Sequence, residues 1–450
     1  MLYNVLKFIA RIGLWVFFRK FEVRNRHLMD TEGPLLVVSN HPNTFMDPIV
    51  TATLLRQQVY FITKSTVFST PFRTWLLQHM NLVPIHRRED NPDLNISNEE
   101  TFKACFKALR ERKSLLIFPE GNSFNERRLR KIKTGTARIA LGVEATSHQP
   151  LGVRILPVGL NYSDPTRFRS DLFVNVGNPI DVASFLPAYN TDPTAAVKAL
   201  TDHIRQQLEK LIIVTASDEE DELVRNIEEI YRTRLAAGSQ ITAPEHEHHF
   251  LLTKSIVKGL SYFNEVAPEL LQNLKQQISD YRLQLNRLRL QDAVLRKGHT
   301  KLLRHSIRMT IFLLLCFPLY LYGLLNNYLP YIIPSKVAKR LTEAQEFMAP
   351  IMMTVGIFSF PLFYLLQSIL FWHLVPNLFY LLLYMVSLPV SGFFTLQYWN
   401  TFERIQDHWL LLKLFLNRST LLSKLREQRE KVLIALEEAR MLYLQKLKKE

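Results

Sequence analysis

The stretch that decides the fold is LLVVSNHPNTFMDP, which runs from Leu35 to Pro48. Its first five residues are apolar or small, and a short run of this kind is typical of a buried strand. Asp47 followed by Pro48 is a favourable helix start, because proline fits the first helical position and aspartate can cap free backbone amides. His41 therefore lies in a strand-to-helix loop, where we expect its imidazole to meet the Asp47 carboxylate.

The residues around this stretch alternate β-rich runs with helical runs between positions 33 and 182. We expect strands at Leu35–Ser39, Val59–Thr63, Leu82–Ile85, Ser114–Phe118, Ile155–Leu160 and Leu172–Val176. Helices fall between them, and Ser97–Arg112 opens with Ser97 and Glu100 at the spacing of a capping box. This order predicts an α/β fold in which a mixed, mainly parallel sheet is covered by helices, with its chemistry in loops at the strand ends.

The pairing of His41 with Asp47 has a chemical interpretation and a structural one. A carboxylate beside an imidazole fixes the tautomer of the ring and stabilises the imidazolium form. We find no serine or cysteine nucleophile in a recognisable setting, so the pair suits direct removal of a proton from a substrate hydroxyl. On this loop alone, a structural histidine beside a capping aspartate explains the pattern equally well.

Two further loops add groups that can bind a phosphate. The strand ending at Phe118 runs into PEGNS, from Pro119 to Ser123, and the basic run RRLRKIK follows at 127–133. Glycine, small polar side chains and free amides can cradle a phosphate, and arginine can clamp it with two hydrogen bonds. The segment PIHRR at 84–88 places Arg87 and Arg88 after another expected strand, which favours a binding site over a solvated surface. For the run at 127–133 the two interpretations are equally good.

Taken together, these motifs resemble the PlsC-type glycerolipid acyltransferases, the glycerol-3-phosphate and lysophosphatidate acyltransferase superfamily. The resemblance covers roughly residues 20–185. Its four motifs correspond in order to Asn40, His41 and Asp47; to PIHRR with Arg87; to FPEGNS, from Phe118 to Ser123; and to ILPV, from Ile155 to Val158. One departure is that five residues separate His41 from Asp47, where the family usually has four. The longer spacing favours the branches that act on glycerol 3-phosphate.

The resemblance implies an enzyme that moves a fatty acyl group from a thioester, either acyl-CoA or acyl carrier protein, to a hydroxyl of glycerol 3-phosphate or dihydroxyacetone phosphate. A lysophosphatidate acyltransferase is the alternative acceptor type. The resemblance also implies that His41 is the general base and Asp47 its partner. The acceptor-binding residues that we expect are Arg87, Glu120, Gly121 and Ser123, with Arg88, Lys64 and Arg128 as further candidates for the phosphate.

No metal or bound cofactor is implied, because the thioester is itself the co-substrate. A membrane-anchored, lipid-binding scaffold without turnover is the non-enzymatic alternative. A lipid hydrolase is less favoured, since no G-x-S-x-G nucleophile elbow is present. Cys105 and Cys316 are the two cysteines of the chain and exclude a disulfide framework. The segment EHEHH, from Glu245 to His249, is interpreted as a solvated loop because no other ligands lie nearby in the sequence.

The formal net charge of +15 requires a partner or a surface that attracts it. Nucleic acid is disfavoured, because no helix-turn-helix spacing, zinc knuckle or RNP-like aromatic run is present. Lys and Arg gather on the cytoplasmic side of membrane proteins, where anionic lipids attract them. We therefore expect anionic membrane lipids as partners, together with the acyl donor and the phosphorylated acceptor. No pattern in the sequence indicates an oligomeric state.

Three apolar segments are long enough to cross a hydrocarbon core, which takes about 20 residues. They are Ile307–Leu325, Met348–Trp372 and Val375–Tyr398. Basic residues flank the tract on both sides, so two cytoplasmic flanks would require an even number of crossings and one segment would be re-entrant or split. We expect a multi-pass membrane protein with two or three spans and a cytoplasmic catalytic domain.

The expected division of the chain follows from these patterns. Residues 1–22 form an amphipathic helix in the membrane interface, since Lys7 and Arg11 would be costly at the bilayer centre, although packing on the soluble domain is the alternative. Residues 23–192 form the catalytic domain and residues 193–300 a helical connector or bundle. Residues 301–400 form the transmembrane region, and residues 401–450 a C-terminal amphipathic helix.

Overall fold

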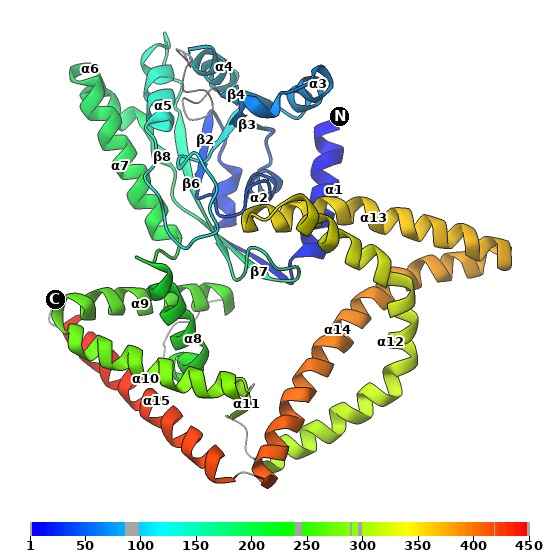
Figure 1. Ribbon diagram of the computed structural model, residues 1–450. Coiled ribbons are helices and arrows are strands. Elements are labelled where there is room, and N and C mark those ends of the chain that lie inside the picture. The colour runs from blue at the N-terminus through cyan, green and yellow to red at the C-terminus, as the bar shows by residue number, and fades with distance from the viewer. Residues whose placement is uncertain are drawn as a thin grey trace. The chain divides into compact units, whose positions relative to one another are not determined.

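The computed structural model describes residues 2–85, 99–238, 245–288, 290–295, 299–417 and 419–447 (Figure 1). The chain forms two compact units. Unit 1 comprises Met1–Val214 with Pro334–Ile357, and unit 2 comprises Thr215–Ile333 with Phe358–Glu450. The His41 loop belongs to unit 1.

Unit 1 is built on one sheet, in which the described residues supply eight strands. The strands are β1 (Lys20–Arg24), β2 (Leu35–Ser39), β3 (Val59–Lys64), β4 (Leu82–Ile85), β5 (Ser114–Ile117), β6 (Arg154–Tyr162), β7 (Asp171–Val176) and β8 (Ile180–Asp181). Their order is β1-β7-β6-β2-β5-β3-β4, with β8 paired to β6 off this path. The pairings of β6 with β7 and β8 are antiparallel and the others are parallel, which confirms the predicted mixed, mainly parallel sheet.

Helices cover both faces of this sheet (Figure 1). The α-helices of residues 2–214 are α1 (Leu2–Phe17), α2 (Met46–Leu54), α3 (Pro71–His79), α4 (Glu99–Arg110), α5 (Gly135–Ala145), α6 (Leu186–Thr191) and α7 (Pro193–Leu211). Short 3₁₀ turns lie at η1 (Arg26–Asp30), η2 (Ser65–Val67) and η3 (Val182–Phe185).

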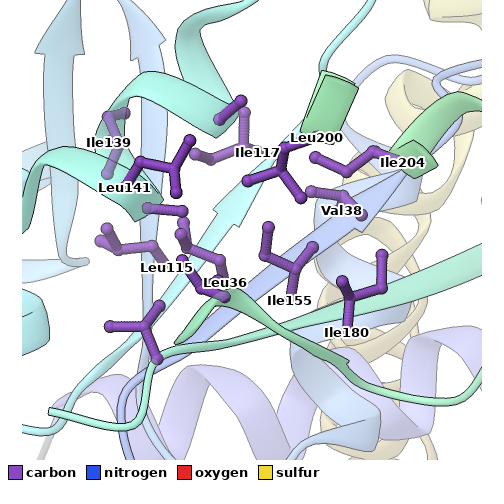
Figure 2. Packing of buried hydrophobic residues seen from close by; sticks show 14 of the residues in the cluster. Leu36, Val38, Leu115, Ile117, Ile139, Leu141, Ile155, Ile180, Leu200 and Ile204 are labelled. Atoms are coloured by element: carbon purple, nitrogen blue, oxygen red, sulfur yellow. The ribbon is translucent and has the colours of Figure 1, made fainter. Parts of the chain in front are cut away.

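The apolar run of β2 fills two cores because successive side chains of a strand point to opposite faces. Leu36 and Val38 pack with residues of β5, α5 and α7, as Figure 2 shows, and with residues of α4. Leu35 and Val37 pack on the other face, with residues of α1 and α2. Full burial of each such side chain contributes about 1.5–3 kcal/mol, so β2 holds the base of the His41 loop firmly.

Two expected boundaries of the catalytic domain are wrong. The first, at residue 22, falls inside β1, which pairs in parallel with β7. The second, at residue 192, would remove α7, although Leu200, Ile204 and Leu208 of that helix belong to the core against β2. Unit 1 therefore includes β1 and continues to Val214.

Helix α1 packs on the domain through its cationic face. Lys7 Nζ donates to the carbonyl of Leu55, and Arg11 donates to the carbonyl of Thr53 at 2.8 and 3.1 Å. These carbonyls end α2, where free acceptors favour cations. The opposite face exposes Leu2, Val5, Phe8, Ile9, Ile12 and Trp15. The alternative of packing on the domain is therefore correct, and the outward apolar face still suits the predicted membrane interface.

Unit 2 and the segments that cross into it are helical. Their helices are α8 (Asp218–Gly238), α9 (Glu245–Val266), α10 (Pro268–Arg287), α11 (Asp292–Leu295), α12 (His299–Leu341), α13 (Gln345–Leu374), α14 (Leu378–Asn417) and α15 (Ser419–Leu447). Helices α8, α9, α10 and α15 share one hydrophobic core, which also holds a buried ion pair between Asp292 Oδ1 and Arg429 Nε at 2.7 Å.

The helix bounds differ from three expectations about this part of the chain. The expected boundaries at 300 and 400 are wrong, because they fall within α12 and α14. The segment Glu245–His249 is the start of α9 and not a loop.

Three helices are long and apolar enough to cross a membrane, by length and composition: Leu303–Leu341, Gln345–Leu374 and Leu378–Leu410, among the described residues. The first was expected to end at Leu325, but α12 continues through Pro330 and Pro334. Pro334 cannot bond the carbonyl of Pro330, and the Ser359 hydroxyl donates to that carbonyl at 3.2 Å instead. A neighbouring side chain that re-satisfies a freed carbonyl is how apolar helices tolerate proline.

Candidate active site

His41 is held between a carboxylate and an aromatic ring. It lies just after β2, separated from Ser39 by Asn40, and Asp47 lies in the first turn of α2. The His41 Nδ1 atom lies 2.9 Å from Asp47 Oδ2. The imidazole stacks on Phe118 at the end of β5, with ring centroids 3.9 Å apart and planes 14° apart. Both orientation and tautomer are therefore fixed, and Nε2 is the ring nitrogen that Asp47 does not use.

The Asp47 carboxylate is buried and receives two further hydrogen bonds. Asn43 N donates to Oδ2 at 2.7 Å, and the Tyr162 hydroxyl donates to Oδ1 at 2.7 Å. Burial, with the neighbouring carboxylate, raises the pKa of Tyr162 well above its ordinary value, so the phenol stays protonated and donates. Asp47 was expected to cap α2, and this is wrong. The helix begins at Met46, and the carboxylate turns back to the loop and to β6, where these donors lie.

The side chains of Asn40 and Glu120 hold the backbone around the site through hydrogen bonds. The Asn40 side chain exchanges two hydrogen bonds with the backbone of Leu160, at 2.8 and 3.0 Å, and so joins the end of β2 to β6. Glu120 accepts the backbone amide of His41 on Oε1 at 3.0 Å and that of Arg130 on Oε2 at 3.1 Å. Burial raises the pKa of Glu120 despite these two bonds. Its contacts position the loops, and acceptor binding by Glu120 stays a prediction.

Gly121 and Ser123 also shape the site. Ser123 Oγ accepts the backbone amide of Thr44 at 2.9 Å, and Phe124 N donates to the carbonyl of His41 at 3.1 Å. Gly121 has a φ of +83°, and a Cβ there would lie 2.9 Å from Cε of Lys133. A side chain would be strained at this φ, so the turn favours glycine, and it brings Lys133 against the loop that was expected to cradle a phosphate.

The expected phosphate-binding cations are only partly placed. Arg87 and Arg88 lie outside the described residues, and so does the side chain of Lys64. Arg128 Nε lies 3.3 Å from a carboxylate oxygen of Glu126. Among the described residues, Lys133 lies against this loop at Gly121, and in the sequence it was named only as part of a basic run.

Sequence reasoning missed three residues that touch the pair. Phe118 stacks on His41, Asn43 bonds Asp47 through its backbone, and Tyr162 bonds Asp47 from β6. Tyr162 carried the weakest signal, since it lies 115 residues from Asp47. A hydroxyl-bearing aromatic residue that ends a buried strand is the pattern that could have drawn attention to it.

The geometry of His41 and Asp47 indicates a class of site by itself. An imidazole oriented by a buried carboxylate, at the carboxyl end of a parallel strand, is an arrangement that can remove a proton from a bound hydroxyl. Residues 20–161 match the family described as Acyltransferase, so this part of the chain is similar to that family.

Individual relatives cover the same region. The chain is 33% identical over 138 residues to "Glycerol-3-phosphate O-acyltransferase 1" of Saccharomyces cerevisiae, which is 30% of this chain and 18% of that protein. It is 29% identical over 167 residues to "1-acyl-sn-glycerol-3-phosphate acyltransferase BAT2, chloroplastic" of Brassica napus, which is 36% of this chain and 46% of that protein. The match thus spans less than half the length of either relative.

Among solved structures, the crystal structure of the 1-acyl-sn-glycerophosphate (LPA) acyltransferase PlsC from Thermotoga maritima is similar with a TM-score of 0.35 and 18% identity. The similarity covers 46% of this chain and 77% of that chain.

Proposed function

We propose that unit 1 transfers a fatty acyl group from a thioester donor, acyl-CoA or acyl carrier protein, to a hydroxyl of a phosphorylated glycerol in phospholipid biosynthesis. The observation that carries this proposal is the contact of 2.9 Å between His41 Nδ1 and Asp47 Oδ2, within the residues that match the Acyltransferase family. Relatives named for acyl transfer to glycerol 3-phosphate and to its 1-acyl derivative support the glycerolipid acceptor.

In the proposed reaction, His41 Nε2 accepts the proton of the acceptor hydroxyl as its oxygen attacks the thioester carbonyl carbon. The new C–O bond forms, and the carbonyl oxygen carries the negative charge of the tetrahedral intermediate. The C–S bond then breaks, the carbonyl reforms, and the leaving thiolate takes the proton back from the imidazolium. Asp47 stabilises that imidazolium, and the Tyr162 hydroxyl and the Asn43 amide hold Asp47 in place.

The acceptor phosphate is assigned to the basic loops in this proposal. Arg87 is the principal residue, with Arg88, Lys64 and Arg128 as further candidates, because an arginine fork matches phosphate geometry. Lys133 is added because it lies against Gly121 at the start of the same loop. The acyl donor is the co-substrate, and no metal or redox cofactor takes part in the proposed step.

Glycerol 3-phosphate, or dihydroxyacetone phosphate, is the proposed acceptor. The reason is the interval of five residues between His41 and Asp47, which resembles that of the acyltransferase branches that act on glycerol 3-phosphate. Lysophosphatidate is the alternative. We place the catalytic unit on the cytoplasmic side, where the net charge of +15 would meet anionic lipids.

The test uses the full chain, purified in detergent, with a labelled acyl donor and each of the three acceptors in turn. Formation of a labelled monoacyl product from glycerol 3-phosphate supports the proposal, and preferential labelling of lysophosphatidate favours the alternative. Release of free fatty acid at the same rate without any acceptor would identify a hydrolase. Lipid binding without turnover on any acceptor would identify a scaffold and overturn the enzymatic proposal.

A further inference from the structure

A segment about 300 residues downstream of His41 lies against the His41 loop within unit 1. This segment is the first turn of α13, Gln345 to Phe347. The Thr44 hydroxyl donates to the carbonyl of Glu346 at 2.6 Å. The Asn125 amide, on the loop that follows Ser123, donates to Gln345 Oε1 at 3.0 Å. One short helical turn therefore bonds both loops that form the candidate active site.

Aromatic and core contacts surround these two hydrogen bonds. The rings of Phe45 and Phe347 meet edge to face, with centroids 6.1 Å apart. Farther along α13, Ala349 and Met353 are buried in the same core as Leu14 of α1. The segment from Pro334 to Ile357 thus belongs to unit 1, and its later residues contribute to the core of that unit.

The backbone of Thr44 shows why the loop needs this support. Its φ is +30°, a left-handed conformation that residues branched at Cβ rarely adopt. Such conformations persist where surrounding contacts determine them, and they concentrate at functional sites. Thr44 has one contact on each side, from its amide to Ser123 Oγ and from its hydroxyl to Glu346.

Loss of one contact of Thr44 would reach the catalytic pair through the preceding residue, Asn43. The Asn43 amide donates to Asp47 Oδ2, which is the oxygen that faces His41 Nδ1. A change in the backbone of Asn43 that displaced this amide would therefore shift the carboxylate that orients the imidazole.

We propose that the turn from Gln345 to Phe347 is a positioning element of the active site, which holds Thr44 so that Asp47 and His41 keep their geometry. The inference rests on the proposed function. Thr44 and Phe45, which contact this turn, both lie in the interval of five residues between His41 and Asp47. Because Gln345 also begins a candidate membrane span, the catalytic loop is tied directly to the apolar part of the chain.

The test replaces Thr44 by Val in the full chain, which keeps the shape of the side chain and removes its hydroxyl. We expect kcat to fall by roughly 10- to 100-fold, because a small displacement of a catalytic group is costly, with both KM values changed less than about twofold. Thr44→Ser keeps the hydroxyl and should restore most of kcat. Thr53→Val is the matched control, since it removes a hydroxyl-to-carbonyl bond of 2.8 Å within α2 that does not reach the turn.

A second readout does not depend on acyl transfer. Amide hydrogen exchange in a peptide covering residues 41–47 should be faster in Thr44→Val and in Phe347→Ala, and unchanged in Thr44→Ser and Thr53→Val. Wild-type kcat in Thr44→Val, or a Ser variant as slow as the Val variant, would overturn the inference. If the wild-type chain transfers no acyl group at all, the proposed function fails. The positioning role is then tested by hydrogen exchange alone, and unchanged exchange at residues 41–47 in both Thr44→Val and Phe347→Ala would overturn it.

Discussion

Substitutions at Asp47 can separate its role in orienting His41 from its contribution to the stability of the domain. Its buried carboxylate accepts hydrogen bonds from three donors: His41 Nδ1 and Asn43 N on Oδ2, and the Tyr162 hydroxyl on Oδ1. Asn can reproduce this pattern, because its oxygen can face the first two donors while its amide group donates to the Tyr162 oxygen. Asp47→Asn therefore keeps every partner, while it removes the negative charge and reverses the direction of the hydrogen bond with Tyr162.

The two substitutions at this position should differ strongly in stability. Asp47→Ala leaves the Asn43 amide and the Tyr162 hydroxyl buried without a partner, and each such group costs about 1–3 kcal/mol. The Ala variant should thus lose about 2–6 kcal/mol, a large part of a typical domain's 5–15 kcal/mol. The loss expected for a helix cap alone is only about 1 kcal/mol, so the experiment also tests whether Asp47 acts only as the cap of α2.

The assay is kcat at saturating substrates, combined with thermal unfolding of the purified chain in detergent. Both variants should lose activity by about 10²–10⁴-fold, because the imidazolium loses its partner charge. Only Asp47→Ala should melt much earlier, by about 2–4 °C for each kcal/mol lost in a domain of this size. Equal melting temperatures for the two variants would refute the three-donor account, and wild-type kcat in Asp47→Asn would refute the orienting role.

Three further predictions follow from neighbouring groups. Tyr162→Phe should cost about 1.5–3 kcal/mol of stability, because a hydrogen bond to a charged group is lost, and an unchanged melting curve would contradict this bond. Arg87→Ala should raise the acceptor KM about tenfold or more and leave the donor KM unchanged, with partial rescue by Lys; an unchanged acceptor KM would remove Arg87 from the site. Burial raises the pKa of Cys105 to about 12, so the native chain should resist alkylation there at pH 8 and Cys105→Ala should keep its activity. Loss of transfer in a folded Cys105→Ala protein would instead indicate an acyl-enzyme.

The central strands and the His41–Asp47 contact could be predicted from the sequence because their signals are local. The bounds of β2 and β4 agree with the expected ranges, since apolar runs end at clear breaks. Strand β1, KFEVR, was missed because it alternates charged and apolar residues like an exposed surface and pairs with β7, about 150 residues away. The two-residue strand β8 is too short to leave a pattern.

The remaining features depend on contacts between distant parts of the chain. Capping by Asp47 was a reasonable expectation from Asp-Pro, but Tyr162 competes for the carboxylate from another strand. Residues 348–357 have the composition of a membrane span, so no sequence pattern separates them from one, yet Ala349 and Met353 fill the core of unit 1. Only the folded chain brings these groups together.

The most direct test of the general-base mechanism is the turnover of His41→Ala. The substitution removes the imidazole but leaves Asp47 bonded to Asn43 and Tyr162, so we expect melting close to wild type and a kcat lower by about 10²–10⁴-fold. His79→Ala is the matched control, because that imidazole lies on α3 and bonds only the carbonyl of Trp75 among the hydrogen bonds of the described residues. His79→Ala should transfer acyl groups at the wild-type rate, and wild-type turnover in pure His41→Ala would contradict the mechanism.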